Sequence, residues 1–218
     1  MKLVSLMVGI ISVSMLIFAT LAAAEDKTII GPYEIAVFDP GAYSQTPTEC
    51  DLLAAHREDP HKVAPGKGQS EISDFPAAIE ACKAAVKADP ENPRLNYQLG
   101  RLYGYSERGD EAMPYRIAAI EAGYPQSLFV IGYIYVIGQN IDQDVCLGAE
   151  LIRHSAFAGR FAGQVAFPNY VLSGEFDNCP VKKERDDMLE MLTLAESNAD
   201  TFYEEMLVSL LKKNVADW

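Results

Sequence analysis

Basic residues are scarce in this chain. Lysine and arginine together number 18 in 218 residues, against 31 aspartates and glutamates, and the formal net charge at pH 7 is −13. A surface this acidic repels the phosphates of nucleic acids and the headgroups of anionic lipids. We therefore expect no nucleic-acid partner, and the charge balance favours solubility.

Residues arranged for catalysis or metal binding are also scarce. The histidines are His56, His61 and His154. His56 and His61 flank Glu58 and Asp59, but a spacing of five places the two histidines on no shared helix face, so we expect solvated side chains rather than metal ligands. No serine, cysteine or threonine lies in a nucleophile motif, and no glycine-rich phosphate loop follows a strand. The sequence predicts no catalytic constellation, no metal and no cofactor.

Charge is absent from one long stretch, Leu3 to Ala24, which ends in three alanines before Glu25. An apolar segment with a small-residue end is typical of a secretory signal peptide, so we predict that residues 1–24 are cleaved. The alternative is an uncleaved anchor, because the 22 uncharged residues could just span a bilayer, but alanines in place of a basic stop favour cleavage. Cleavage removes Lys2 and leaves 194 residues of net charge −14. We expect a periplasmic or secreted protein with no stable membrane insertion.

Residues 25–73 show little helical pattern. β-forming residues from Thr28 to Ile30 and from Tyr33 to Phe38 are bracketed by turn residues, which predicts an irregular arm with at most one short strand. Cys50 to His56 can form one or two helical turns, and the prolines and glycines that follow predict a loop to about Ser73. An arm this apolar is expected to pack against the rest of the chain.

Residues 74–178 carry apolar side chains at helical spacing. Asp74 can cap a helix that ends at Asp89-Pro90, and Pro93 opens a second helix that runs to about Arg108. Asp110 can cap the next helix. We therefore expect consecutive helices joined by short turns.

The same region repeats internally. Ala78 recurs 34 residues later as Ala112, and the pair Ala122-Gly123 recurs 36 residues later as Ala158-Gly159. Such periods are typical of helix-turn-helix units that bury their apolar faces only against neighbouring units. The sequence predicts an all-α fold, a short α-solenoid.

Residues 179–218 are predicted to form two C-terminal capping helices. The first, Lys182 to Ser197, is expected to bury Met188, Met191, Leu192 and Ala195, and the second, Asp200 to Asn214, to bury Phe202, Met206, Leu207, Leu210 and Leu211. The terminal unit of a solenoid needs a polar face, and the charged segment 182–190 is expected to supply it.

Residues 76–174 resemble two known helical repeats. Leu99-Gly100 with Tyr103 resembles a tetratricopeptide unit, whereas Ile131-Gly132 with Gly148-Ala149 resembles the longer Sel-one-like (Sel1-like) repeat, whose glycines let two helices approach closely. A third unit departs from the pattern, because Pro168 replaces the glycine of its first helix. That departure predicts a kinked or shortened helix.

The resemblance implies a protein-interaction module whose concave groove is lined by the first helix of each unit. Carried onto this sequence, the ligand-facing positions are Arg94, Tyr97, Arg101, Gln126, Phe129, Tyr133 and Asn169. Arginine binds carboxylates through two parallel hydrogen bonds and stacks on aromatic rings, so the expected partner is a protein or peptide with an acidic or C-terminal segment. The alternative is that the arginines offset neighbouring acidic residues and that Phe129 and Tyr133 belong to the core.

Four cysteines allow three pairings, and exported sequence favours two disulfides over thiols. The resemblance to exported helical-repeat proteins favours Cys50–Cys82, because the segment between them looks similar to the first part of such proteins. It also favours Cys146–Cys179, because adjacent repeats bring these positions together.

Two other functions remain open. Some cysteine-rich Sel-one-like proteins are β-lactamase-like or penicillin-binding enzymes, but their disulfides recur within each repeat, and these cysteines do not follow the 36-residue period. The third possibility is a structural or regulatory subunit held by a large partner, with the apolar arm from Ile29 to Phe38 as its docking strand.

Overall fold

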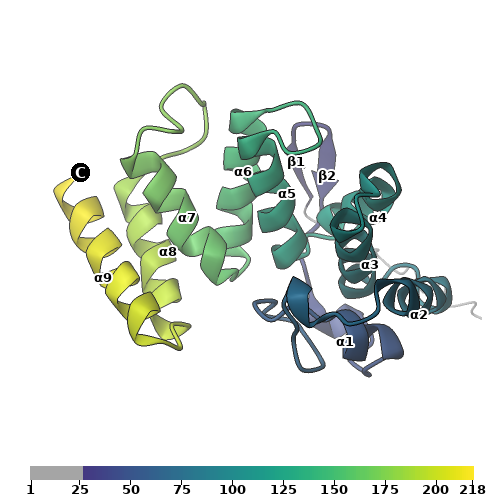
Figure 1. Cartoon of the computed structure of the whole chain (residues 1–218). Helices are drawn as coiled ribbons and strands as arrows, with labels where there is room; N and C mark the ends of the chain where they lie inside the picture. Colours follow the sequence, from purple (N-terminus) through teal and green to yellow (C-terminus); the bar gives the residue numbers. More distant parts are fainter. Residues whose placement is uncertain (1–26) are drawn as a thin grey trace, which may run out of the picture.

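The computed structural model describes residues 27–218 (Figure 1). The predicted signal peptide, residues 1–24, lies outside the described residues. The described elements are β1 (Thr28–Ile30), β2 (Tyr33–Ile35), the 3-10 turn η1 (Pro40–Ala42), α1 (Glu49–Ala54), the 3-10 turn η2 (Gln69–Glu71), α2 (Phe75–Ala88), α3 (Pro93–Tyr105), α4 (Gly109–Glu121), α5 (Pro125–Ile137), α6 (Val145–Phe157), α7 (Phe161–Leu172), α8 (Arg185–Ser197) and α9 (Phe202–Asp217). The predicted all-α solenoid with an irregular N-terminal arm is confirmed.

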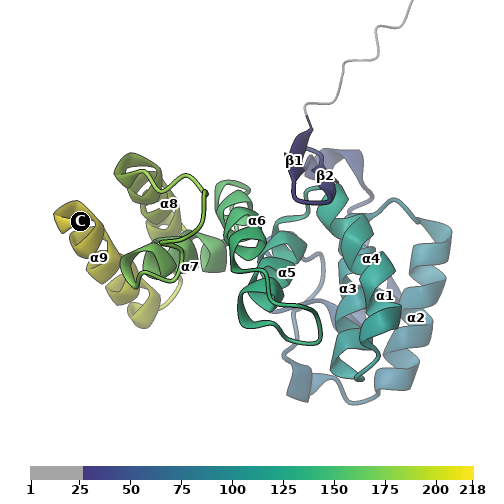
Figure 2. The same cartoon turned by 90° about the horizontal axis from the view of Figure 1, so that it is seen from above.

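The helices stack in chain order, from α2 at one end of the molecule to α9 at the other (Figures 1 and 2). Neighbours in the sequence pack as hairpins: α3 with α4, α5 with α6, and α7 with α8. Ala122 and Ala158 directly follow the ends of α4 and α6. The 36-residue period therefore carries the α4–α5 junction onto the α6–α7 junction.

α5 and α6 approach each other closely at two glycines. A Cβ atom added to Gly132 would lie 3.0 Å from the carbonyl oxygen of Gly148, and one added to Gly148 would lie 3.0 Å from the backbone nitrogen of Val136. Any larger residue at either position would push the two backbones apart. This bears out the expectation that glycines let the two helices of this unit approach.

Both predicted disulfides are present. Cys50 and Cys82 join α1 to α2 with an S–S distance of 1.98 Å, and Cys146 and Cys179 join α6 to the loop before α8 at 2.12 Å. The first bridge is fully buried in a cluster formed by α1, α2 and α3. The second lies beside the larger C-terminal core of α6 to α9.

The N-terminal arm packs across the array. It contains two antiparallel strands, β1 and β2, where at most one was predicted. The backbone N–H of Ala36 donates to the carbonyl of Glu121 at 2.8 Å, and the hydroxyls of Tyr33 and Tyr135 are 2.7 Å apart. The hairpin thus holds α4 and α5 together from outside.

The third unit is more regular than predicted. α7 contains Pro168 yet has 12 residues, against 13 in α5. The prediction of a shortened helix holds by one residue only. A second proline in a helix interior is Pro114 of α4, which the sequence pattern did not single out.

The predicted C-terminal helix is present as α9, but its predicted buried face is wrong at four of five positions. Leu211 is buried, but Phe202, Met206, Leu207 and Leu210 are between 39% and 70% exposed. The helix instead buries Val208, Leu211 and Val215 against α7 and α8. By contrast, all four residues predicted to be buried in α8 are buried. No described helix is both long enough and apolar enough to cross a bilayer.

Candidate functional site

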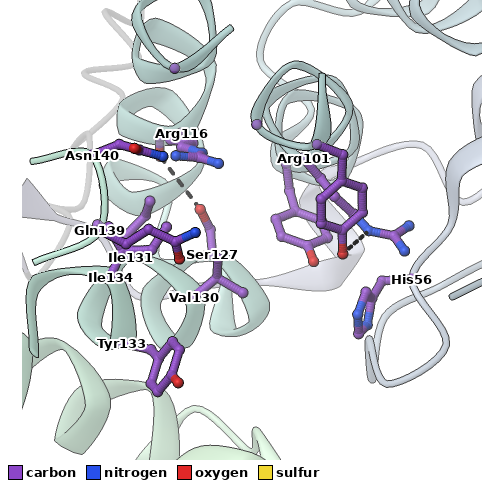
Figure 3. Close-up of a pocket in the computed structure, with 14 residues that line it drawn as sticks. His56, Arg101, Arg116, Ser127, Val130, Ile131, Tyr133, Ile134, Gln139 and Asn140 are labelled. Atoms are coloured by element: carbon purple, nitrogen blue, oxygen red, sulfur yellow. Dashed lines mark hydrogen bonds between the residues drawn. The ribbon is translucent and has the colours of Figure 1, made fainter. Parts of the chain in front are cut away.

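A pocket of about 300 Å³ lies between α3 and α5, the first helices of two successive units. Figure 3 shows His56 and Arg101 on one side of the pocket and Ser127 and Tyr133 on the other. Its lining residues are His56, Tyr97, Arg101, Gly104, Tyr105, Gly109, Arg116, Ser127, Val130, Ile131, Tyr133, Ile134, Gln139 and Asn140. Although the chain is strongly acidic, none of these described residues is an aspartate or glutamate.

Arg101 contributes a charge that no carboxylate among the described residues neutralises. Its guanidinium donates to the carbonyl oxygens of Ala54 at 2.8 Å and Lys67 at 2.7 Å, and to the hydroxyl of Tyr105 at 3.2 Å. All three acceptors are neutral. These bonds hold Arg101 in place and leave its positive charge uncompensated.

Arg116, on α4, is the second cation of the pocket. Among the described residues its side chain makes no hydrogen bond and no ion pair, while its backbone carbonyl accepts from the Ser127 hydroxyl at 3.4 Å. Burial lowers the pKa of Arg116. An arginine keeps its charge at neutral pH even so, and a half-buried guanidinium without a partner favours an anionic ligand.

Arg116 has room because α3 carries glycines opposite it. A Cβ atom at Gly104 would collide with the end of the Arg116 guanidinium, and one at Gly100 would lie 3.0 Å from its Cγ atom. The spacing of four between these glycines puts both on one face of α3. That face forms the space in which Arg116 lies.

His56 adds a neutral hydrogen-bond donor. Burial, followed by the charges of Arg101, Arg160 and other cations, lowers the pKa of His56 to about 4. Its Nδ1 atom accepts the backbone N–H of Glu58 at 3.1 Å, so the proton of the neutral ring is on Nε2. The expectation of solvated histidines is wrong for His56, because the loop after α1 folds back over α3.

A buried polar pair anchors that loop. The hydroxyl of Tyr124, at the start of α5, donates to the carboxylate of Asp59 at 2.6 Å, and both residues are fully buried. Burial raises the pKa of Asp59. The backbone N–H of His61 donates to the same carboxylate at 3.0 Å. The loop is thus tied to the helices that form the pocket.

Of the seven residues predicted to face a ligand, Tyr97, Arg101 and Tyr133 line this pocket. The hydroxyl of Tyr97 accepts from the buried amide of Gln126 at 3.0 Å, so Gln126 supports the pocket floor from behind. Phe129 stacks against Tyr133, with ring centroids 6.4 Å apart. Asn169 is exposed on α7 and does not line the pocket.

The expectation that Arg94 faces a partner must be corrected. Its Nε atom lies 2.8 Å from an Asp51 oxygen, and a second nitrogen donates to the carbonyl of Ser44 at 2.9 Å. Arg94 is 3% exposed. This is the alternative considered from the sequence, in which arginine offsets a neighbouring acidic residue.

The positions missed from the sequence include His56, Arg116 and the α5–α6 turn, Gln139 and Asn140. Arg116 escaped notice because it belongs to the second helix of its unit, which repeats of this kind place away from the groove. The signal that could have found it is the pair Gly100 and Gly104. Two glycines four apart on a groove-lining helix indicate that something from the next helix fills the space.

Comparison with known proteins adds a structural similarity. No protein-family profile and no curated protein matches the chain. A crystal structure of a Sel1 repeat protein from Oxalobacter formigenes is similar, with 23% sequence identity, a TM-score of 0.48, and coverage of 64% of this chain and 98% of that one.

Proposed function

We propose that this protein is an exported interaction module that binds a protein or peptide partner in the pocket between α3 and α5, and that the bound segment carries a carboxylate. The single observation behind this proposal is the uncompensated charge of Arg101 and Arg116 in a pocket free of acidic residues. Arg116 can form two parallel hydrogen bonds with one carboxylate. The rings of Tyr105 and Tyr133 provide apolar surface for the adjacent part of the ligand.

The disulfides and the N-terminal sequence support export. Disulfides persist in oxidising compartments such as the periplasm or the exterior, and the described part of the chain holds two. The uncharged stretch from Leu3 to Ala24 fits the same interpretation. The acidic surface suits a partner that is selected by a local basic pocket and repelled elsewhere.

The test compares two labelled peptides of the same length, one rich in glutamate and one with glutamine in its place. We expect wild-type protein to bind the glutamate peptide more tightly, measured by fluorescence anisotropy at low and high salt. Arg116→Gln should weaken that binding by roughly tenfold or more, since hydrogen bonds to charged groups contribute about 1.5–3 kcal/mol. The proposal would be overturned if wild type bound both peptides equally. It would also be overturned if Arg116→Gln bound the glutamate peptide as tightly as wild type does.

Arg185→Gln is the matched control. Arg185 is exposed at the start of α8, makes no ion pair among the described residues, and lies outside the pocket. Like Arg116→Gln, this variant removes one positive charge, but it does so away from the pocket. It should therefore leave the affinity unchanged. The same three proteins, used to capture partners from a periplasmic extract, would identify the natural ligand.

The enzymatic alternative lacks an activated nucleophile in this pocket. The hydroxyl of Ser127 donates to the carbonyl of Arg116, and no described histidine, lysine or carboxylate forms a hydrogen bond with it. A serine needs an adjacent base to act as a nucleophile. We expect no nitrocefin hydrolysis by the purified protein, and turnover would favour the β-lactamase-like alternative.

A further inference from the structure

The outward face of α9 is apolar and uncovered. Phe202 is 70% exposed, Tyr203 75%, Met206 52% and Leu210 56%. α9 lies at the end of the array, with α8 and α7 on its inner side and no described element on its outer side (Figures 1 and 2). We call Phe202, Tyr203, Met206, Leu207 and Leu210 the α9 face.

The residues of the α9 face are spaced as in the ridges through which helices pack against one another. Phe202, Met206 and Leu210 are four residues apart and form one ridge along the helix, with Tyr203 and Leu207 beside it. The opposite side of α9 buries Val208, Leu211 and Val215 in the core. A helix that is apolar on two opposite sides is built to contact a structure on each of them. The outermost helix of a soluble repeat array ordinarily presents a polar outer side.

The charged residues of α9 indicate what kind of structure packs against the α9 face. Acidic residues Glu204 and Glu205 lie in the first turn, and Lys212 and Lys213 lie eight residues later. Glu204 caps the helix through Thr201, and Lys212 pairs with Glu196 of α8 at 2.5 Å. Glu205 and Lys213 are exposed and have no ion-pair partner among the described residues. A free acid at one end of the ridge and a free base at the other match a second α9 that runs in the opposite direction.

We propose that the α9 face binds the α9 face of a second copy of this chain, with the two helices antiparallel about a two-fold axis. In such an interface the same patch is used by both copies. Met206 of one copy packs against Leu210 of the other, and Glu205 of each lies near Lys213 of the other. Antiparallel helices also bring the opposite ends of their dipoles together. The proposal concerns a surface distinct from the α3–α5 pocket and does not depend on it.

The interface is expected to be weak. One helix face from each copy supplies two aromatic and three aliphatic side chains, and an aromatic side chain buries about 150–250 Å² when fully covered. The total therefore falls near the lower end of the roughly 1,200–2,000 Å² found in specific interfaces. A monomer–dimer equilibrium at micromolar concentration follows, rather than a permanent dimer.

Sedimentation velocity over a concentration series tests the proposal. Wild type should shift from monomer to dimer as its concentration rises, and the double variant Met206→Glu/Leu210→Glu should remain monomeric. Both positions are more than half exposed, so the variant should keep the helical circular dichroism of wild type. Leu52→Glu is the control, because Leu52 is 48% exposed on α1 at the far end of the array. A monomeric wild type, or a double variant that still dimerises, would overturn the proposal.

Reversing the charges of Glu205 and Lys213 distinguishes an antiparallel dimer from other modes of association. Glu205→Lys alone and Lys213→Glu alone each place like charges opposite one another in a symmetric dimer, so each should dimerise less than wild type. An equal mixture of the two variants should recover dimerisation, because a heterodimer then holds an opposite charge at both contacts. Failure of the mixture to exceed the separate variants would refute the antiparallel arrangement.

Discussion

Arg94 and Asp51 form a buried ion pair that links α3 to α1. The Nε atom of Arg94 lies 2.8 Å from Oδ1 of Asp51, and the two side chains are 3% and 0% exposed. Gln98 donates to the same carboxylate at 2.9 Å, and the carboxylate also accepts from Thr48. Burial alone would raise the pKa of Asp51, but the hydrogen bonds from Arg94, Thr48 and Gln98 outweigh it and hold the pKa below its ordinary value.

Removing one partner of this pair should be costly. Arg94→Met leaves the Asp51 charge buried without a cation, and we expect a loss of about 3–5 kcal/mol in the free energy of unfolding. Chemical denaturation measures the change. Adding Asp51→Asn to Arg94→Met should restore part of the loss, because the uncompensated charge is then removed.

The control for this prediction is an exposed ion pair. Arg108 and Glu111 are 43% and 52% exposed and 2.5 Å apart, so Arg108→Met should cost less than about 1 kcal/mol. A cost at Arg94 no larger than the cost at Arg108 would show that the buried pair does not stabilise the fold. It would also reopen the possibility that Arg94 serves a ligand.

His56 should make stability depend on pH. Burial and neighbouring cations lower its pKa in the folded protein from 6.5 to about 4, so the unfolded chain binds the proton first as the pH falls. The contribution of His56 is therefore complete above pH 6.5 and is lost progressively as the pH falls to about 4. We expect the urea midpoint of wild type to fall more steeply over this window than that of His56→Gln.

The difference between the pH profiles of wild type and His56→Gln reports the titration of His56 alone. Burial raises the pKa of Asp59, which acts in the opposite direction because the folded state then favours the protonated carboxyl as the pH falls. Asp59, His61 and His154 are present in both proteins, so their effects cancel in the difference. Parallel profiles for wild type and His56→Gln would show that the ring is not held neutral by the fold.

The sequence was sufficient for the repeat architecture but not for the α9 face. Periods of 34 and 36 residues correspond to stacked hairpins, because each unit has to bury the same face against its neighbour. In α9, apolar residues lie on two sides of the helix, Val208 and Leu211 on one and Met206 and Leu210 on the other. Periodicity shows that both sides are apolar, and it contains no information on which side the rest of the chain covers.

The pocket was predicted only in part, for a similar reason. The resemblance chose α3 and α5 as the groove-lining helices, and three of its seven residues, Tyr97, Arg101 and Tyr133, line the pocket between these helices. It could not tell that Asp51, far away in the sequence, would neutralise Arg94. Nor does a repeat pattern show that the loop after α1 brings His56 into the pocket, because this loop is outside the repeats.

The two disulfides should stabilise the fold by similar entropic amounts. They close loops with sequence separations of 32 and 33 residues, each worth about 3–4 kcal/mol in the chain-entropy model. Cys50→Ser/Cys82→Ser should cost more than Cys146→Ser/Cys179→Ser, because Cys50 and Cys82 are fully buried and the hydroxyl at position 82 would lie in an apolar cluster, whereas a hydroxyl at position 50 can donate to Gln98. Urea unfolding of both variants measures the order, and the reverse order would contradict it.

Gly104→Ala should remove the ligand site without weakening the fold, if the pocket binds as proposed. The added methyl group collides with the end of the Arg116 guanidinium, which is flexible and can move away from the pocket at little cost. Alanine also favours a helix by about 1 kcal/mol over glycine, so the thermal midpoint should hold or rise. Affinity for the glutamate peptide should nevertheless fall, as is expected for Arg116→Gln. Gly109→Ala is the matched control, because nothing lies within 4 Å of the added atom there, although Gly109 lines the same pocket. Unchanged affinity in Gly104→Ala would mean that the space opposite Gly104 is not what positions Arg116 for the ligand.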